Sequence, residues 1–187
     1  DMDAIPEERL AAIEDIRDAF HGSLRGVSLL ADDRALRRLE ETISQTVRTN
    51  YYRLGGTTPS QRSGGVPYIS YKFLVGNVEK SRPTELLFEV WVHSARMEGV
   101  HLRGATVARG GIRWSDRPDD FRTEILGLVN TQMVKDAVIV PGGSEGGFVA
   151  RSTPSDPEAR WEEGREQYQT LIRGLLDVTD NLVDGRN

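Results

Sequence analysis

Apolar side chains recur every three or four positions in the first third of the chain, as they do on one face of an amphipathic helix. One such stripe covers residues 10–20. A second follows the acidic pair at residues 32–33 and consists of Leu36, Leu39, Ile43 and Val47. The pattern predicts two helices, and the residues rich in Gly, Ser and Thr that follow, 55–65, predict a loop.

The middle of the chain changes to a period of two. Residues 68–75 alternate inward and outward positions as a partly buried strand does, and residues 86–92 and 100–108 predict two more strands, the last with a bulge at Gly104. The helical period returns over residues 119–135, where acidic residues of the first turn complement the helix dipole. These segments predict three strands followed by a helix.

A short apolar run, residues 137–140, then predicts a strand covered on both faces. The glycine-rich residues 142–147 predict a loop with an exposed backbone, because glycine permits unusual dihedral angles and close approach of another group. Asp156 and Pro157 are suited to begin a long final helix. Its stripe consists of Trp161, Tyr168, Ile172, Leu175, Thr179 and Leu182.

This order of elements predicts an α/β fold with some α+β character, in which helices flank a mixed sheet. We expect a helical lead-in over residues 1–54, a flexible loop over residues 55–66, and one domain over residues 67–187. A chain of 187 residues with 37% hydrophobic residues is long enough to bury a core of that kind.

Charge and composition exclude several classes of function. The net charge is −5 and the Lys and Arg residues are scattered among acids, so we expect no nucleic acid partner. Cysteine is absent, which rules out disulfides and thiolate metal sites and fits a cytoplasmic location. No apolar run approaches the length of a membrane span, so we expect no membrane partner.

Several common catalytic motifs are missing. The glycine-rich segment lacks the Lys-Ser or Lys-Thr of a Walker loop, and no G-x-G-x-x-G sequence occurs, so no dinucleotide-binding unit is visible. His21, His93 and His101 are far apart and form no metal-ligand pattern. We therefore expect neither a metal nor a bound cofactor within this chain.

One group of polar residues remains. Arg109 ends a predicted strand, while Gln132 and Lys135 lie three residues apart on one face of the predicted helix. Two cations and an amide suit a small dicarboxylate. The alternative is that both cations are solvated or ion-paired and the neighbouring glycine pairs are ordinary turns.

A family resemblance favours the first interpretation. Residues 109–148, RGGIRWSDRPDDFRTEILGLVNTQMVKDAVIVPGGSEGGF, closely resemble the catalytic region of the large bacterial NAD-specific glutamate dehydrogenases. Further matching segments are EGVHLRG at residues 98–104, RGLLDVTDNLVDG at 173–185, TNYYR at 49–53 and PYISYKF at 67–73. The resemblance implies the substrate-binding domain of an amino-acid dehydrogenase. The Rossmann domain that binds NAD in such enzymes would lie outside this chain.

The resemblance also implies roles for particular residues. Arg109, before the pair Gly110-Gly111, stands where the superfamily has a cation that binds the side-chain carboxylate of glutamate. Gln132 and Lys135 match the Gln-x-x-Lys that holds the α-carboxylate. The implied substrates are L-glutamate and 2-oxoglutarate with NAD as cofactor, and relatives of this kind form homo-oligomers.

Glu145 departs from the family pattern. Relatives carry a lysine at this position, which polarises the substrate carbonyl, and this chain reads Ser-Glu-Gly-Gly. A carboxylate about 4 Å from an anionic 2-oxo acid would cost roughly 4 kcal/mol at an effective dielectric constant near 20. The expected loss of rate is at least about a thousandfold. Two hypotheses follow: a glutamate dehydrogenase part that is inactive alone, or a non-catalytic binding or assembly module derived from the same site.

Overall fold

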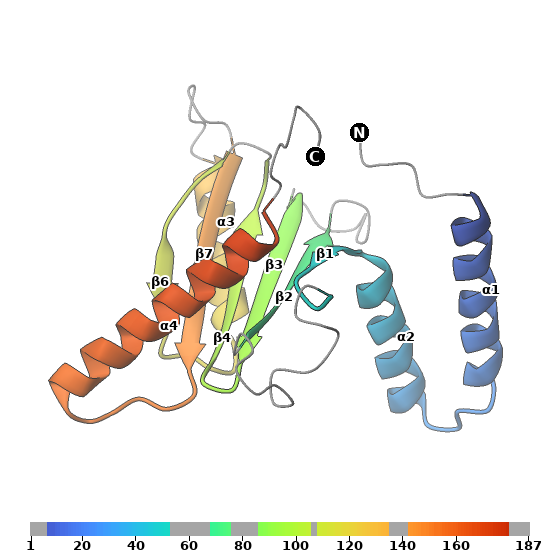
Figure 1. Ribbon diagram of the computed structural model, residues 1–187, viewed down its shortest axis with the longest axis horizontal. Helices are drawn as coiled ribbons and strands as arrows, with labels where there is room; N and C mark the ends of the chain where they lie inside the picture. The colour runs from blue at the N-terminus through green and yellow to red at the C-terminus, as the bar shows by residue number, and fades with distance from the viewer. Residues whose placement is uncertain (1–6, 53–67, 76–85, 106–107, 135–141, 180–187) are drawn as a thin grey trace. The chain divides into compact units, whose positions relative to one another are not determined.

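The computed structural model describes residues 7–52, 68–75, 86–105, 108–134 and 142–179 (Figure 1). They belong to two compact units: the described residues up to 44 form one, and the described residues from 45 to 179 form the other. The predicted loop at residues 55–66 and the predicted strand at residues 137–140 lie outside the described residues.

The first unit contains two helices, α1 (Glu7–Leu24) and α2 (Leu30–Ser44), which confirms both predicted helices. Glu40 of α2 connects them: its carboxylate accepts a hydrogen bond from Arg17 Nε at 2.8 Å and lies 3.6 Å from His21 Nε2. The apolar stripes of both helices include exposed side chains, among them Ile16 and Ile43.

Seven strands of the second unit form one mixed sheet. They are β1 (Thr46–Thr49), β2 (Tyr68–Leu74), β3 (Phe88–Ser94), β4 (Met97–Arg103), β5 (Ala108–Arg109), β6 (Ile112–Trp114) and β7 (Gly142–Ala150). The order is β1-β2-β3-β4-β7-β5, and β6 also pairs with β7. The pairs from β1 to β4 and β4 with β7 are antiparallel, whereas β5 and β6 run parallel to β7. The predicted mixed sheet of an α/β fold is confirmed.

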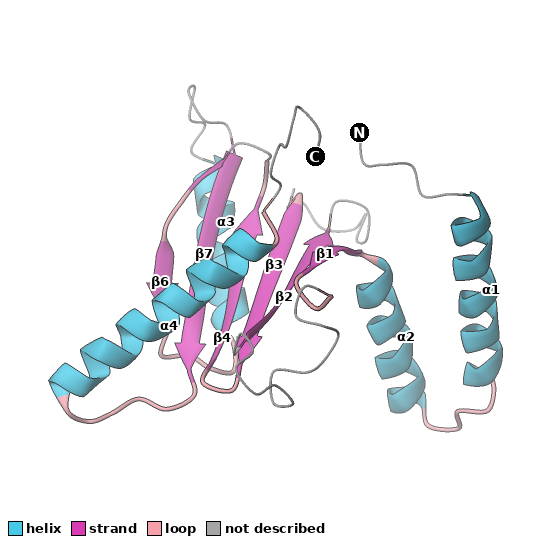
Figure 2. Ribbon diagram, in the orientation of Figure 1, coloured by secondary structure: helices cyan, strands magenta, loops and turns pink. Residues whose placement is uncertain are grey.

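One helix covers each face of this sheet (Figure 2). Helix α3 (Phe121–Val134) packs on β4 and β7, and α4 (Pro157–Asp177) packs across β2, β3, β4 and β7 on the other face. The core on the α4 face consists of Tyr68, Val90, Val92, Met97, Phe148, Leu171 and Val178. The core on the α3 face consists of Leu86, Val100, Leu102, Phe121, Ile125, Val129 and Val149. Strand alternation thus supplies two cores, one on each side of β7.

Helix α4 begins as predicted but buries a different face. The Asp156 side chain accepts a hydrogen bond from the backbone N–H of Ala159 at 2.8 Å and caps the helix. Trp161 of the predicted apolar stripe is 67% exposed, so the prediction that this side chain is buried is wrong. The buried residues include Gly164 and Gly174, where an added Cβ would come within 2.5 Å of the Trp114 ring and 2.6 Å of Val92. The helix lies so close to the sheet that two of its buried positions are glycines; the other buried residues are Glu163, Gln167 and Leu171.

Two predicted boundaries also differ from the structure. Val47 was placed on the stripe of the second helix, but it lies in β1, which pairs with β2. Gly104 was predicted as a bulge within a strand, but β4 ends at Arg103 and the Gly104 N–H donates to the carbonyl of Gly143 at 2.9 Å. In both places long-range pairing replaces the local pattern.

The glycine-rich residues 142–147 form the first part of strand β7 and not a loop. This strand lies inside the sheet, with β4 on one side and β5 and β6 on the other. Glycine fits here because neighbouring groups come very close: a Cβ on Gly147 would lie 2.4 Å from Ile125 of α3. The prediction of a loop was wrong because these contacts come from residues distant in sequence.

No helix within the described ranges has both the length and the apolar character needed to cross a membrane. The same ranges contain no group of three or more His, Cys, Asp or Glu side chains that could hold a metal ion.

Candidate functional site

Strand β7 places Glu145 in the interior of the protein. Glu145 pairs with Leu102 of β4 and is 3% exposed. Paired residues of neighbouring strands point to the same face, so Glu145 lies on the face that α3 covers, together with Leu102. A carboxylate is therefore buried at the position where the family resemblance leads us to expect lysine.

The two oxygens of the Glu145 carboxylate differ in their hydrogen bonding to the described residues. Gln132 of α3 donates from Nε2 to Oε1 of Glu145. Oε2 is buried and has no hydrogen-bond partner among the described residues. Arg113 Nε lies 4.0 Å from Oε2, which is the outer limit of an ion pair and too long for a hydrogen bond. Gln132 and Glu145, two of the predicted site residues, are thus in direct contact.

Arg109 lies on the neighbouring strand β5, where it pairs with Gly143 of β7. Gly143 and Glu145 are two residues apart on β7 and share one face of the sheet, so the register assigns Arg109 to the face of Glu145. Two residues of a strand span roughly 6.5 Å. Arg109 is exposed, whereas Glu145 is buried. The exposed cation and the buried carboxylate therefore belong to one short stretch of the same sheet face.

Gly110 and Gly111 connect β5 to β6 where the backbone passes closest to β7. A Cβ on Gly110 would lie 1.3 Å from the carbonyl oxygen of Ser144, so no larger residue fits this backbone. The Gly111 carbonyl accepts a hydrogen bond from the Gly146 N–H at 2.8 Å. A Cβ on Gly111 would lie 3.6 Å from Oε2 of Glu145, an ordinary contact distance. The glycine pair holds the connection against β7, and Gly111 places no side chain of its own beside Oε2.

The structure adds Arg113 to the predicted set of site residues and does not describe Lys135. Lys135 lies outside the described residues. Arg113 was not predicted, although it lies in the matching segment after the glycine pair. Its partner in the register is Gly147, two residues from Glu145, which explains why its side chain comes near the carboxylate. Only the pairing of β6 with β7 reveals this, because the two strands are far apart in sequence.

His101 of β4 lies beside the same part of β7 as Glu145, but its side chain is on the opposite face of the sheet. It pairs with Gly146, and a Cβ on that glycine would lie 3.1 Å from the His101 ring. Burial, together with the charge of Arg103, lowers the pKa of His101 to about 4. The imidazole is neutral in the folded protein at neutral pH.

We expect this lowered pKa to make folding sensitive to acid. Below a pH near 6.5 the unfolded chain binds a proton at His101, whereas the folded protein does not until the pH approaches about 4. The free energy of unfolding should therefore fall by about 3 kcal/mol more in the native protein than in His101→Gln as the pH falls from 7 to 4. Urea unfolding of both proteins at several pH values measures this difference. Parallel pH dependence in the two proteins would contradict the assignment.

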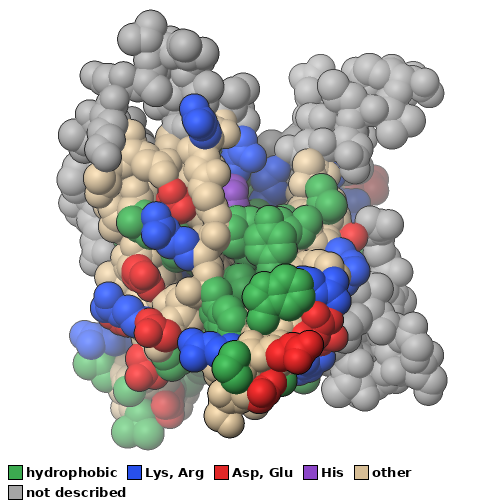
Figure 3. All heavy atoms as spheres, turned by 90° about the vertical axis from the view of Figure 1, so that its left-hand side faces the viewer, with side chains coloured by type: hydrophobic (Ala, Val, Ile, Leu, Met, Phe, Trp, Pro, Cys, Tyr) green, Lys and Arg blue, Asp and Glu red, His purple; other side chains and the backbone are tan. Residues whose placement is uncertain are grey.

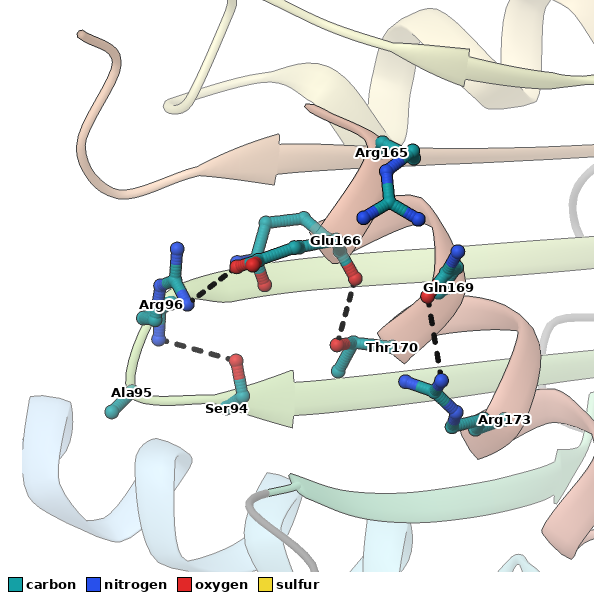
Figure 4. Close-up of a pocket in the computed structure, with 9 residues that line it drawn as sticks. Ser94, Ala95, Arg96, Arg165, Glu166, Gln169, Thr170 and Arg173 are labelled. Carbon is teal, nitrogen blue, oxygen red and sulfur yellow. Dashed lines mark hydrogen bonds and ion pairs between the residues drawn. The ribbon is translucent and has the colours of Figure 1, made fainter. Parts of the chain in front are cut away.

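Two hollows in the surface lie apart from these residues. The first, about 370 Å³, lies between the turn at Ser94 and α4 (Figure 4). One of the arginines that line it, Arg96, pairs with Glu166 at 2.8 Å and with Glu163. The second has a volume of about 550 Å³. It is lined by Trp114, Ser115, Asp116, Pro118, Val149, Ala150, Thr153 and Arg160. The view from the side of β6 shows hydrophobic side chains gathered among charged ones (Figure 3). Of the predicted site residues that the structure describes, none lines either hollow.

Comparison with known proteins gives consistent matches. The family model of the catalytic domain of bacterial NAD-glutamate dehydrogenase matches residues 19–187. The chain is 48% identical over 178 residues to an NAD-specific glutamate dehydrogenase of Halomonas elongata. The aligned region covers 92% of this chain and 10% of that protein. The identity to the enzyme of the same name from Pseudomonas aeruginosa is 47% over 173 residues, covering 91% of this chain and 10% of that protein.

A third relative, the NAD-specific glutamate dehydrogenase of Mycobacterium tuberculosis, is 48% identical over 163 residues, which is 82% of this chain and 10% of that protein. The chain thus spans about a tenth of the length of the curated relatives it matches. The matched region includes strands β1 to β7 and every site residue named above. The chain belongs to the bacterial NAD-glutamate dehydrogenase family and represents part of its catalytic domain.

Proposed function

We propose that this chain is the substrate-binding part of an NAD-dependent glutamate dehydrogenase. In the whole protein L-glutamate, NAD⁺ and water give 2-oxoglutarate, ammonium, NADH and a proton. The observation that carries the proposal is the match of the catalytic-domain model over residues 19–187, supported by relatives of 47% and 48% identity. NAD, which accepts the hydride, would be bound by a domain outside these residues, and we expect a cytoplasmic homo-oligomer.

The site residues have complementary roles in this proposal. Arg109, exposed at the end of β5, binds the side-chain carboxylate of glutamate. Gln132 and Lys135, three residues apart in sequence, bind the α-carboxylate. Gly110 and Gly111 allow the backbone to approach the substrate closely. Charge-assisted hydrogen bonds of this kind give both affinity and orientation to a dicarboxylate.

The 187-residue chain should bind L-glutamate without turning it over. Removal of one charged contact costs about 1.5 to 3 kcal/mol, so Arg109→Ala should weaken binding by about 10- to 100-fold. Isothermal titration calorimetry measures the affinity. Arg165→Ala is the matched control, because Arg165 is an exposed arginine on α4 that pairs with Glu162, away from the site. Unchanged affinity in Arg109→Ala, or failure of L-glutamate to bind, would contradict the proposed site.

A specific observation favours a second function, that of a non-catalytic binding or assembly module. Glu145 is buried and accepts a hydrogen bond from Gln132, which is one of the residues proposed to hold the substrate. A buried carboxylate there opposes the charge that develops on the substrate oxygen during the reaction. The two functions differ in turnover by the whole protein, since a binding module would bind L-glutamate but reduce no NAD.

A further inference from the structure

One oxygen of Glu145 accepts no hydrogen bond from the described residues and suits a positively charged donor. Glu145 is 3% exposed, and its Oε1 accepts from Gln132 while Oε2 has no hydrogen-bond partner among the described residues. A buried carboxylate oxygen without a donor is costly, and a cation that donates a hydrogen bond is the group that compensates it best. Arg113 comes within 4.0 Å of Oε2 but does not reach hydrogen-bonding distance. Oε2 therefore lacks a hydrogen-bond donor among the described residues, and a ligand that reaches it could supply one.

Gln132 connects the Glu145 carboxylate with the proposed substrate groups. This residue, proposed to hold the α-carboxylate, is also the one that donates to Glu145. If the α-carboxylate of a ligand contacts Gln132, its α-amino or α-oxo group is only one carbon away from that contact and can face the Glu145 carboxylate. Beside Oε2 lies Gly111, where even an added Cβ would remain at 3.6 Å, so no side chain of this residue blocks the approach.

The two substrates of the proposed enzyme differ in that substituent. L-glutamate carries an α-ammonium group, which is positive and donates hydrogen bonds, whereas 2-oxoglutarate carries a carbonyl oxygen, which only accepts them. The ammonium complements Oε2, and the carbonyl oxygen would face a second acceptor of like charge. We propose that Glu145 makes this site selective for amino acids over 2-oxo acids, with Oε2 accepting a hydrogen bond from the α-ammonium group. This inference rests on the proposed binding of glutamate.

Arg113 is the internal competitor for the same oxygen. Its side chain is 55% exposed, so it can move, and a small shift would bring it from 4.0 Å to hydrogen-bonding distance of Oε2. An arginine seated there would satisfy the carboxylate and remove the reason for selectivity. Which ligands the native chain prefers shows whether Arg113 or the α-ammonium group of a ligand contacts Oε2.

The test compares three ligands that differ only at the α-carbon: L-glutamate, glutarate and 2-oxoglutarate. Isothermal titration calorimetry of the 187-residue chain should show tightest binding for L-glutamate and weakest for 2-oxoglutarate. The two affinities should differ by at least about tenfold, the effect of one charge-assisted hydrogen bond. Glutarate, which has no substituent at this carbon, should fall between them. This series uses the native chain and so does not depend on whether a variant folds.

Two variants then assign the preference to Glu145. Glu145→Gln should bring the affinities for L-glutamate and 2-oxoglutarate within about threefold of each other, and Glu145→Lys should reverse the order. Glu162→Gln, an exposed carboxylate on α4, is the matched control and should retain the native preference.

The possible failures are distinct. Equal affinities in the native chain, or a native preference that survives in Glu145→Gln, would overturn the selectivity while leaving the proposed substrate site intact. If none of the three ligands binds, the proposed substrate site fails and the selectivity fails with it.

Discussion

The whole protein with Glu145→Lys is expected to oxidise L-glutamate with NAD at least about a thousandfold faster than the protein with Glu145. Two effects combine. The substitution removes a buried negative charge, which costs roughly 4 kcal/mol against an anionic oxygen about 4 Å away, and it adds a positive charge at the developing oxyanion. Glu145 is 3% exposed, so solvent screens little of this interaction. The formation of NADH at saturating L-glutamate measures the rate.

Glu145→Gln separates the two effects, because it removes the negative charge without adding a positive one. Its rate should lie between those of the other two proteins. Thermal unfolding of all three proteins shows whether the substitutions at this buried position keep the fold. Rapid turnover by the protein with Glu145, or no gain from lysine in a folded variant, would disprove the charge argument.

The second large effect is expected for Gly110→Ala, which should lower the free energy of unfolding by about 3 kcal/mol. The added Cβ would lie 1.3 Å from the carbonyl oxygen of Ser144 and 2.4 Å from its carbonyl carbon. Both atoms belong to the backbone of β7, so no side-chain rotation relieves the overlap and the strands must separate. Urea unfolding at neutral pH measures the loss of stability.

Gly111→Ala is the matched control for this prediction. Its Cβ would lie 3.6 Å from the nearest atom found, Oε2 of Glu145, so the loss of stability should be below about 1 kcal/mol. If both substitutions destabilise the protein equally, the close approach of Gly110 to Ser144 is not what makes glycine necessary.

Local patterns predicted those elements whose structure depends on neighbours in sequence. Helix α3 occupies residues within the predicted range, and α4 begins at the predicted cap, because capping and helical periodicity act over a few residues. Strand β2 also follows its alternating pattern. The predicted burial of α4 failed because apolar character alone did not decide which face lies against the sheet; the close contacts of Gly164 and Gly174 did.

The candidate site was predictable to a similar extent. The family resemblance identifies Arg109, Gln132 and Glu145, and the structure brings Gln132 and Glu145 into contact. Their roles in substrate binding stay predictions. The sequence did not predict Arg113 as a site residue, because its proximity to Glu145 depends on the register of β6 with β7. A register between distant segments has no signal in the local spacing of residues.

The sequence by itself determined the helices, the cap at Asp156, the family and the identity of the charged residues around the glycine pairs. Only the tertiary structure decided that residues 142–147 lie in a strand, that Glu145 is buried, and that one of its oxygens has no hydrogen-bond partner within the described part of the chain. The physical reason is that periodicity and capping act between neighbours in the chain, whereas burial and hydrogen bonding of Glu145 depend on β4, β6 and α3. These elements meet at β7 only after the chain has folded.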